Sequence, residues 1–205
     1  MHSFRSAFRE SIKLGPREIR TLTALSEFKG KETLFARQSP EILKSLAEVA
    51  KVESVESSNR IEGISVPRAR YRPLVLQNSR PKNRTEMEIV GYRDALGLIH
   101  EMHKDMPLTT NVILQLHTYI YRRTTVPSGK WKVADNESVD RTSDGETVLR
   151  FKPVSAMETP PAMDELVGSY GTWRGAPDFE TLIAVPLFVL DFLCIHPFKD
   201  GNGRT

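Results

Sequence analysis

The chain has 205 residues, 39% of them hydrophobic, which suits one compact core or two small ones and excludes a disordered or fibrous repeat protein. Its 29 lysines and arginines against 26 aspartates and glutamates leave a formal net charge of +3, so charge alone selects no partner. A single cysteine, Cys194, excludes an internal disulfide and favours a cytoplasmic compartment. We expect no signal peptide and no membrane partner, because the N-terminus is charged throughout and the longest apolar run, 182–195, is too short to span a bilayer.

The first half of the chain predicts one clear helix. Residues 1–40 contain several helix breakers and no sustained apolar period. From Pro40 apolar residues recur at helical spacing and predict a helix that ends near Ile61, before Gly63. Residues 66–84 hold six basic residues and no acidic one, and they predict an exposed connection or a short helix with a positive surface.

Two further helices are predicted in the middle of the chain. Thr85 is the expected N-cap of the first, because Glu88 follows three residues later in a capping-box pattern. Thr109 or Thr110 is the expected N-cap of the second, which ends near Arg123.

The period then changes between residues 127 and 153. The pair Asp144-Gly145 predicts a hairpin turn between a strand at 138–142 and a strand at 146–151. A helix from Pro160-Pro161 follows. One β-hairpin in an otherwise helical chain calls for a functional explanation.

The last predicted helix, which begins at Asp178 or Thr181, leads directly into a polar loop at residues 196–204. Pro197 cannot continue the helix, so His196 lies at the mouth of the loop and its imidazole is presented outward. We expect Phe198, an apolar residue in a polar loop, to anchor the loop to the core.

The remaining loop residues suit a phosphate ligand. Glycines at 201 and 203 allow successive N–H groups to converge into an anion-binding nest. Asp200 offers a hard oxygen ligand for Mg²⁺, and Arg204 offers a fork of donors for a phosphate. The loop therefore combines a general base, a metal ligand and an anion site within nine residues.

Residues 196–204 match in full the HPFx(D/E)GNGR signature of the Fic family, which the chain resembles from about Phe28 to its end. Residues 58–63 resemble the family's inhibitory-helix motif, (S/T)xxxE(G/N), and the predicted hairpin lies where the family has its target-docking flap. The resemblance implies a mainly α fold, a Fic-type helical bundle with one β-hairpin flap over the active-site loop. It also implies an N-terminal extension over residues 1–65 that ends in the inhibitory helix, followed by a Fic core over residues 66–205.

By this resemblance the protein transfers AMP from ATP to a Ser, Thr or Tyr hydroxyl of a target protein. His196 would act as general base and Asp200 would hold Mg²⁺. The nucleotide-binding residues would be Gly201, Asn202, Gly203 and Arg204, with the Asn202 side chain on the α-phosphate and Arg204 on the leaving phosphates. The GNG sequence favours nucleotide transfer over phosphate transfer. The residues expected to dock the target along a strand edge are Glu146, Thr147, Val148, Leu149, Arg150 and Phe151.

The resemblance makes Ser58 and Glu62 the inhibitory residues, on one face of their helix. In the family this glutamate pairs with a second arginine three residues after the first, and another helix follows. Because the sequence stops at Thr205, we expect a truncated chain in which Glu62 lacks that cation and apolar surface of the last helix is exposed. Removal of AMP as a reverse reaction and association into homo-oligomers, both seen in the family, stay open.

Two other functions compete with this interpretation. A truncated core could be a catalytically silent module that binds nucleotide or protein. A nucleic-acid-binding regulator could use the basic stretch 66–84, but Tyr71 is its one aromatic residue, so no stacking platform supports this function.

Overall fold

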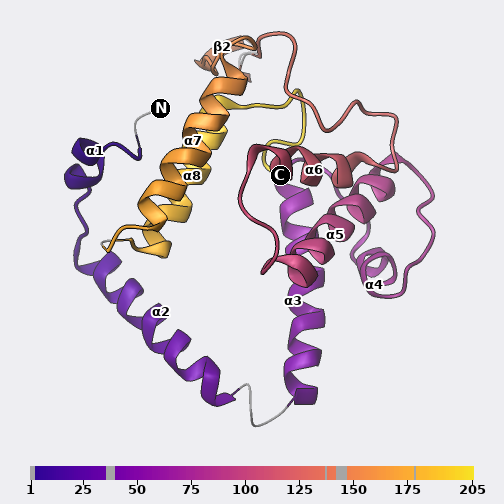
Figure 1. Ribbon diagram of the computed structural model, residues 1–205. Coiled ribbons are helices and arrows are strands. Elements are labelled where there is room, and N and C mark those ends of the chain that lie inside the picture. Colours follow the sequence, from indigo (N-terminus) through magenta and orange to yellow (C-terminus); the bar gives the residue numbers. More distant parts are fainter. Residues whose placement is uncertain (1–2, 36–39, 137, 142–146, 178) are drawn as a thin grey trace.

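A computed structural model describes residues 3–35, 40–136, 138–141, 147–177 and 179–205 (Figure 1). Within these ranges the chain is mainly helical, as expected. The helices are α1 (Ser6–Ser11), α2 (Pro16–Phe35), α3 (Pro40–Ile61), α4 (Arg68–Leu76), α5 (Arg84–Met102), α6 (Thr110–Tyr121), α7 (Thr159–Arg174) and α8 (Thr181–Ile195). Two short strands, β1 (Ser138–Arg141) and β2 (Thr147–Phe151), pair antiparallel.

The N-caps of α5 and α6 are polar side chains of the usual kind, but one of them is not the residue that we predicted. Asn83 caps α5, since its side chain accepts a hydrogen bond from the Glu86 N–H at 2.9 Å. The prediction of Thr85 as the cap was therefore wrong, and the helix begins at Arg84. Thr109 caps α6 by accepting from the Val112 N–H at 3.2 Å, which decides between the two threonines.

The C-terminus of α3 ends in a Schellman motif around Gly63. Gly63 has φ +74°, a conformation that a residue with a Cβ rarely adopts. Its N–H donates to the Arg60 carbonyl at 3.0 Å, and the Ile64 N–H donates to the Asn59 carbonyl at 2.9 Å. This turn places Glu62 immediately after Ile61, the last residue of the helix, so the predicted end of this helix is confirmed.

The buried residues form three clusters. One joins the C-terminal half of α3 to α4 and α5, one joins α6, α7 and α8 to the loop at 196–204, and a small one lies between α5 and α6. Tyr71, Leu74 and Val75 of α4 are buried in the first cluster, so the basic stretch 66–84 contains a short packed helix at 68–76, which a non-helical segment at 77–83 connects to α5. The first cluster contains residues from both sides of residue 65. The predicted boundary between an N-terminal extension and a core at that residue stays a prediction.

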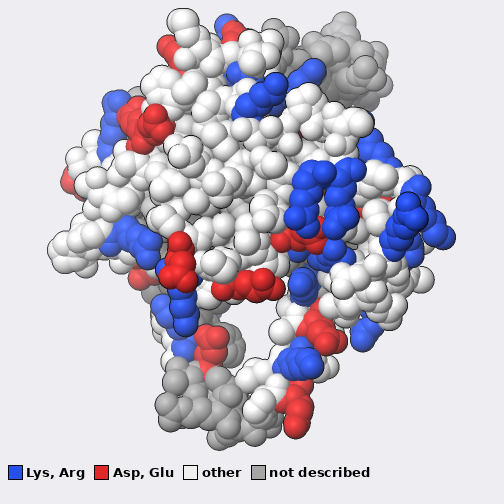
Figure 2. Space-filling model, turned by 45° about the vertical axis from the view of Figure 1, so that its right-hand side comes forward, with Lys and Arg blue, Asp and Glu red and all other residues white. Residues whose placement is uncertain are grey.

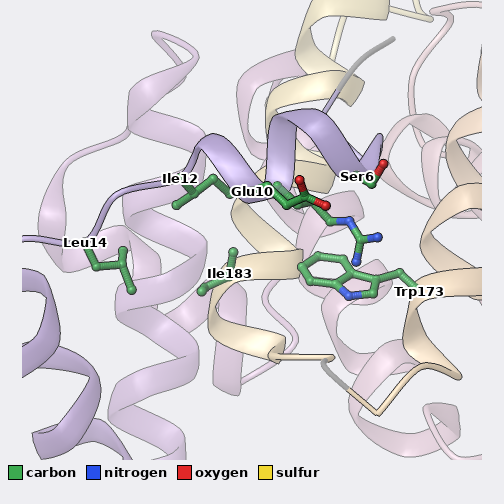
Figure 3. A pocket seen from close by; sticks show the side chains of 7 residues that line it. Ser6, Glu10, Ile12, Leu14, Trp173 and Ile183 are labelled. Carbon is green, nitrogen blue, oxygen red and sulfur yellow. The ribbon is translucent and has the colours of Figure 1, made fainter.

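The N-terminal residues pack on the pair of adjacent helices α7 and α8 (Figure 1). The Ser3 hydroxyl donates to the buried Asp191 carboxylate at 2.7 Å, and the Phe4 ring makes edge contacts with Tyr170 and Trp173. A shallow pocket of about 280 Å³ lies under α1. Figure 3 shows it between α1, with the residues that follow this helix, on one side and Trp173 and Ile183 on the other. The buried carboxylate of Asp191, which interrupts the apolar run of α8, therefore receives its hydrogen bonds from Ser3 of the N-terminal segment.

Helix α2 extends away from this body, and the space-filling view is open between it and α3 (Figures 1 and 2). The face that apolar residues form in the first half of α3 is largely exposed, with Ile42 at 60% and Leu46 at 59%. Several apolar residues of α8 are also exposed, namely Leu182, Val185, Val189, Leu190 and Leu193. None of the helices in the described ranges is both long and apolar enough to cross a membrane.

Candidate active site

His196 is the C-cap of α8 and starts the loop. Its backbone is left-handed, with φ 52° and ψ 61°, and its N–H donates to the Phe192 carbonyl. This conformation costs about 1–2 kcal/mol for a residue with a Cβ, and it turns the chain away from the helix axis. The imidazole is half-buried. Burial lowers the pKa of His196, the nearby Lys132 cation lowers it further, and a hydrogen bond to the Leu193 carbonyl opposes both, so the neutral imidazole is favoured at neutral pH.

Phe198 and Asn202 hold the inward side of the loop. The Phe198 side chain is fully buried and stacks on the His117 ring at 3.8 Å, with the rings 5° from parallel. The side-chain oxygen Oδ1 of Asn202 accepts from the Phe198 backbone N–H, and the side-chain Nδ2 of Asn202 donates to the Phe198 backbone carbonyl, both at 2.8 Å. Both polar groups of Asn202 are therefore engaged with the loop's own backbone.

His117 of α6 supports the loop from below. Its Nδ1 accepts from the Gly129 N–H at 3.0 Å, so its Nε2 carries the proton and donates to the Asp200 carbonyl at 3.1 Å. Burial lowers the pKa of His117, in agreement with this neutral tautomer. Sequence reasoning missed His117, although a histidine between Ile113 and Ile120 on the buried face of a helix is the signal that could have found it.

Arg204 points inward and is fully buried. Its guanidinium donates to Glu88 at 2.9 Å and to the Tyr121 hydroxyl at 2.6 Å, and it lies over the Tyr121 ring. Glu88 also accepts from Arg84 at 2.8 Å. Burial raises the pKa of Tyr121, so its hydroxyl stays protonated. Arg204 thus joins the end of the loop to α5 and α6.

The outward side of the loop carries Asp200 and Gly203. The Asp200 side chain is 49% exposed, and its Oδ1 accepts from the Gly201 N–H at 2.7 Å. Gly201 has φ +80°, and a Cβ there would lie 2.7 Å from the Tyr121 hydroxyl, so this turn requires glycine. A cavity of about 510 Å³ adjoins Asp200 and leaves space beside its carboxylate.

Glu62 and Ser58 come to the site from α3. A Cβ on Gly203 would lie 1.8 Å from Glu62 Oε1, so the carboxylate rests directly against the exposed glycine of the loop. The Ser58 hydroxyl accepts from the Tyr92 hydroxyl of α5 at 2.9 Å. The end of α3 is therefore placed against the loop by its own cap and by α5.

Comparison with known proteins identifies the domain that contains this loop. Residues 107–205 match the Fic/DOC family, a range that includes the complete signature. These residues form a Fic/DOC family domain. The resemblance inferred from the signature is therefore confirmed.

Two solved structures are similar to the chain. One is a Fic domain containing signaling protein from Bacteroides thetaiotaomicron VPI-5482, with 26% identity and a TM-score of 0.75 over 87% of this chain. The other is a Fic family protein from Desulfovibrio desulfuricans G20, with 18% identity and a TM-score of 0.70 over 94% of this chain, which supports the fold alone. The chain spans 67% of the first protein and 55% of the second. No curated protein sequence matches it.

The predicted β-hairpin is described in part. Strand Thr147–Phe151 pairs with Ser138–Arg141, whereas Glu146 and the turn lie outside the described residues, as do the side chains of residues 147–150. The Phe151 side chain is half-buried. A flap over the active-site loop and its docking function stay predictions.

Proposed function

We propose that the protein is an adenylyltransferase that transfers AMP from ATP to a Ser, Thr or Tyr hydroxyl of a target protein. One observation carries the proposal: the Glu62 carboxylate rests against Gly203, the exposed glycine of the loop. An anionic group is thus already accommodated at the place where the nest of N–H groups would receive a phosphate. The Fic/DOC domain supports a transferase of this class.

In the proposed reaction His196 is the general base. Its neutral imidazole takes the proton of the target hydroxyl as that oxygen forms a bond to the α-phosphorus of ATP, and the bond to the bridging oxygen breaks so that pyrophosphate leaves. Burial favours the unprotonated imidazole that this step needs. The step is balanced without any further reactant.

The loop contributes a fixed shape. Asn202 and His117 hold the backbone of the loop from inside, so the N–H groups of Asn202 and Gly203 are preorganised for phosphate oxygens, while the Gly201 N–H donates to the Asp200 carboxylate. Because the Asn202 amide and the Arg204 guanidinium are engaged internally, we assign phosphate binding first to the backbone. Direct contacts of these two side chains with phosphate require rearrangement of the bonds described here.

Asp200 fits a magnesium site that is completed by substrate. The described residues hold no cluster of three or more metal-ligating side chains, and Mg²⁺ in nucleotide sites typically takes one or two carboxylates with phosphates and waters. Asp200 is half-exposed next to a cavity, which suits this arrangement. Bound Mg²⁺ would neutralise charge on the phosphates and on the departing pyrophosphate.

The same contact that supports the phosphate site supports autoinhibition by α3. A carboxylate against Gly203 repels a phosphate and occupies its space, so the proposed resting state excludes a productively bound triphosphate. The edge of β2 is the proposed docking site for an extended segment of the target.

Labelling with α-³²P-ATP and Mg²⁺ in a cell lysate tests the proposal. Wild type, His196→Ala and Glu62→Ala are compared, and Glu53→Ala serves as the control because it removes an exposed carboxylate from the same helix. We expect His196→Ala to label at least ~10²-fold more slowly, Glu62→Ala to label faster than wild type, and Glu53→Ala to match wild type. Undiminished labelling by His196→Ala would refute the mechanism, and binding of Mg·ATP without any transfer would assign a binding module instead.

A further inference from the structure

Lys132 makes two hydrogen bonds that bracket His196. Its Nζ donates to the Ile195 carbonyl at 3.0 Å, and its backbone N–H donates to the Pro197 carbonyl at 2.8 Å. These carbonyls belong to the residues immediately before and after His196. One residue, 63 positions away from Ile195 in the sequence, therefore holds both sides of the histidine.

The position of Lys132 explains how His196 keeps its left-handed backbone. Such a conformation persists only where the surroundings determine it, and Lys132 fixes the peptide that precedes His196 and the peptide that follows Pro197. The Ile195 carbonyl also belongs to the last turn of α8, where carbonyls lack helical partners. A cation at this end of a helix interacts favourably with the helix dipole.

The environment of the Lys132 side chain is unusual for a lysine. The residue is 5% exposed, and the Ile195 carbonyl is the one hydrogen-bond acceptor that its ammonium has within the described part of the chain. Burying an ammonium group without a carboxylate is costly. Lys130, two residues earlier, is exposed. The same segment thus offers one lysine in solvent and one that is buried against the backbone of the candidate base.

We infer that Lys132 is a positioning residue for His196, which fixes the backbone beside the histidine by its two hydrogen bonds. The inference deepens the proposed function and rests on it for the catalytic consequence. The Lys132 charge acts in the same sense: after burial, this cation lowers the pKa of His196, while the hydrogen bond to the Leu193 carbonyl raises it. Asp135 is the carboxylate that acts on Lys132 itself.

Four variants test the inference. Lys132→Met removes the charge and the side-chain donor, Lys132→Gln keeps a donor without charge, Lys132→Arg keeps both, and Lys130→Met removes the exposed neighbouring charge as a matched control. Each is measured for kcat and for the KM of ATP in the labelling assay, and the imidazole pKa of His196 is measured by NMR with ¹³C-labelled histidine.

We expect Lys132→Met to lower kcat at least about tenfold while the KM for ATP changes less than about threefold, because the base and not the nucleotide site is disturbed. The pKa of His196 should rise in Lys132→Met and in Lys132→Gln, because both variants remove the cation that lowers it. Lys132→Arg should recover most of kcat and the low pKa, and Lys130→Met should leave both unchanged.

Two outcomes would overturn the inference: an unchanged pKa of His196 in Lys132→Met and Lys132→Gln, or a loss of kcat that Lys132→Arg does not reverse. If Lys132→Met does not fold, as judged by circular dichroism, Lys132→Gln decides. If wild type transfers no AMP, the proposed function fails, and the NMR titration still tests the role of Lys132 independently.

Discussion

The inward and outward sides of the loop at 196–204 are built in opposite ways. Phe198, Asn202 and Arg204 point inward, are buried, and are stacked or hydrogen-bonded to His117, Glu88, Tyr121 or the loop itself. Asp200 and Gly203 face outward and are exposed, and His196 is half-buried between the two sides. The comparison shows that the short signature encodes two functions: one set of residues folds the loop, and the other is available to a ligand. Substitutions should therefore separate stability from activity.

The largest effect on stability is expected from Glu88→Met. This change leaves the fully buried Arg204 guanidinium with the Tyr121 hydroxyl and the half-exposed Asp200 carboxylate at 3.9 Å, but without its buried carboxylate at 2.9 Å. Loss of one partner of a buried ion pair costs about 3–5 kcal/mol. Urea denaturation gives the free energy of unfolding. Arg84→Met is the control, since it removes the exposed partner of the same carboxylate, and its effect should be clearly smaller. Equal losses for both variants would contradict an inward side that is held by Arg204.

An intermediate effect is expected from Asn202→Ala. The Phe198 N–H would then be buried without an acceptor, whereas the Phe198 carbonyl keeps the Asn136 amide at 2.9 Å. An unsatisfied buried group costs about 1–3 kcal/mol, and a looser loop should also reduce AMP transfer. Asn136→Ala removes one of two donors to that carbonyl, so thermal denaturation should show a smaller change for it. Asn202→Ala with native stability would place its side chain among the ligand-binding groups instead.

The smallest effect on stability is expected from Asp200→Asn on the outward side. Exposed positions usually change the free energy of unfolding by no more than about 0.5 kcal/mol, and this side chain is 49% exposed. AMP transfer, in contrast, should fall and should require more Mg²⁺, because the amide is a weaker ligand than the carboxylate. A titration of labelling rate against Mg²⁺ measures this. An unchanged Mg²⁺ requirement would remove Asp200 from the proposed metal site.

The parts of the fold that were predictable carry local signals. The helix from Pro40 to Ile61 and its stop at Gly63 follow from apolar periodicity and from a glycine in the left-handed region. Asn83 was missed as the cap of α5 because Thr85 with Glu88 makes an equally good capping pattern in sequence. Tertiary contacts also decided that part of the basic stretch 66–84 is a packed helix, since Tyr71, Leu74 and Val75 of α4 are buried in the core.

The residues of the candidate site also differ in how well the sequence predicts them. Its ligand-facing residues lie in one contiguous motif, so their chemistry is readable from residue types and spacing. Lys132, His117 and Glu88 lie 64 to 108 residues from His196 in the sequence, and no local pattern links a lysine, a histidine and a glutamate to a loop so far away. Their contributions depend on which elements pack together.

The sequence by itself determined the match of residues 107–205 to the Fic/DOC family, the order of the main helices and the residue types of the loop, because each of these depends on residues close together in the sequence. The tertiary structure decided which loop residues face inward, that Glu62 meets Gly203, and that Lys132 lies against His196. The physical reason is that burial, charge pairing and the energy of a left-handed backbone depend on groups brought together by folding.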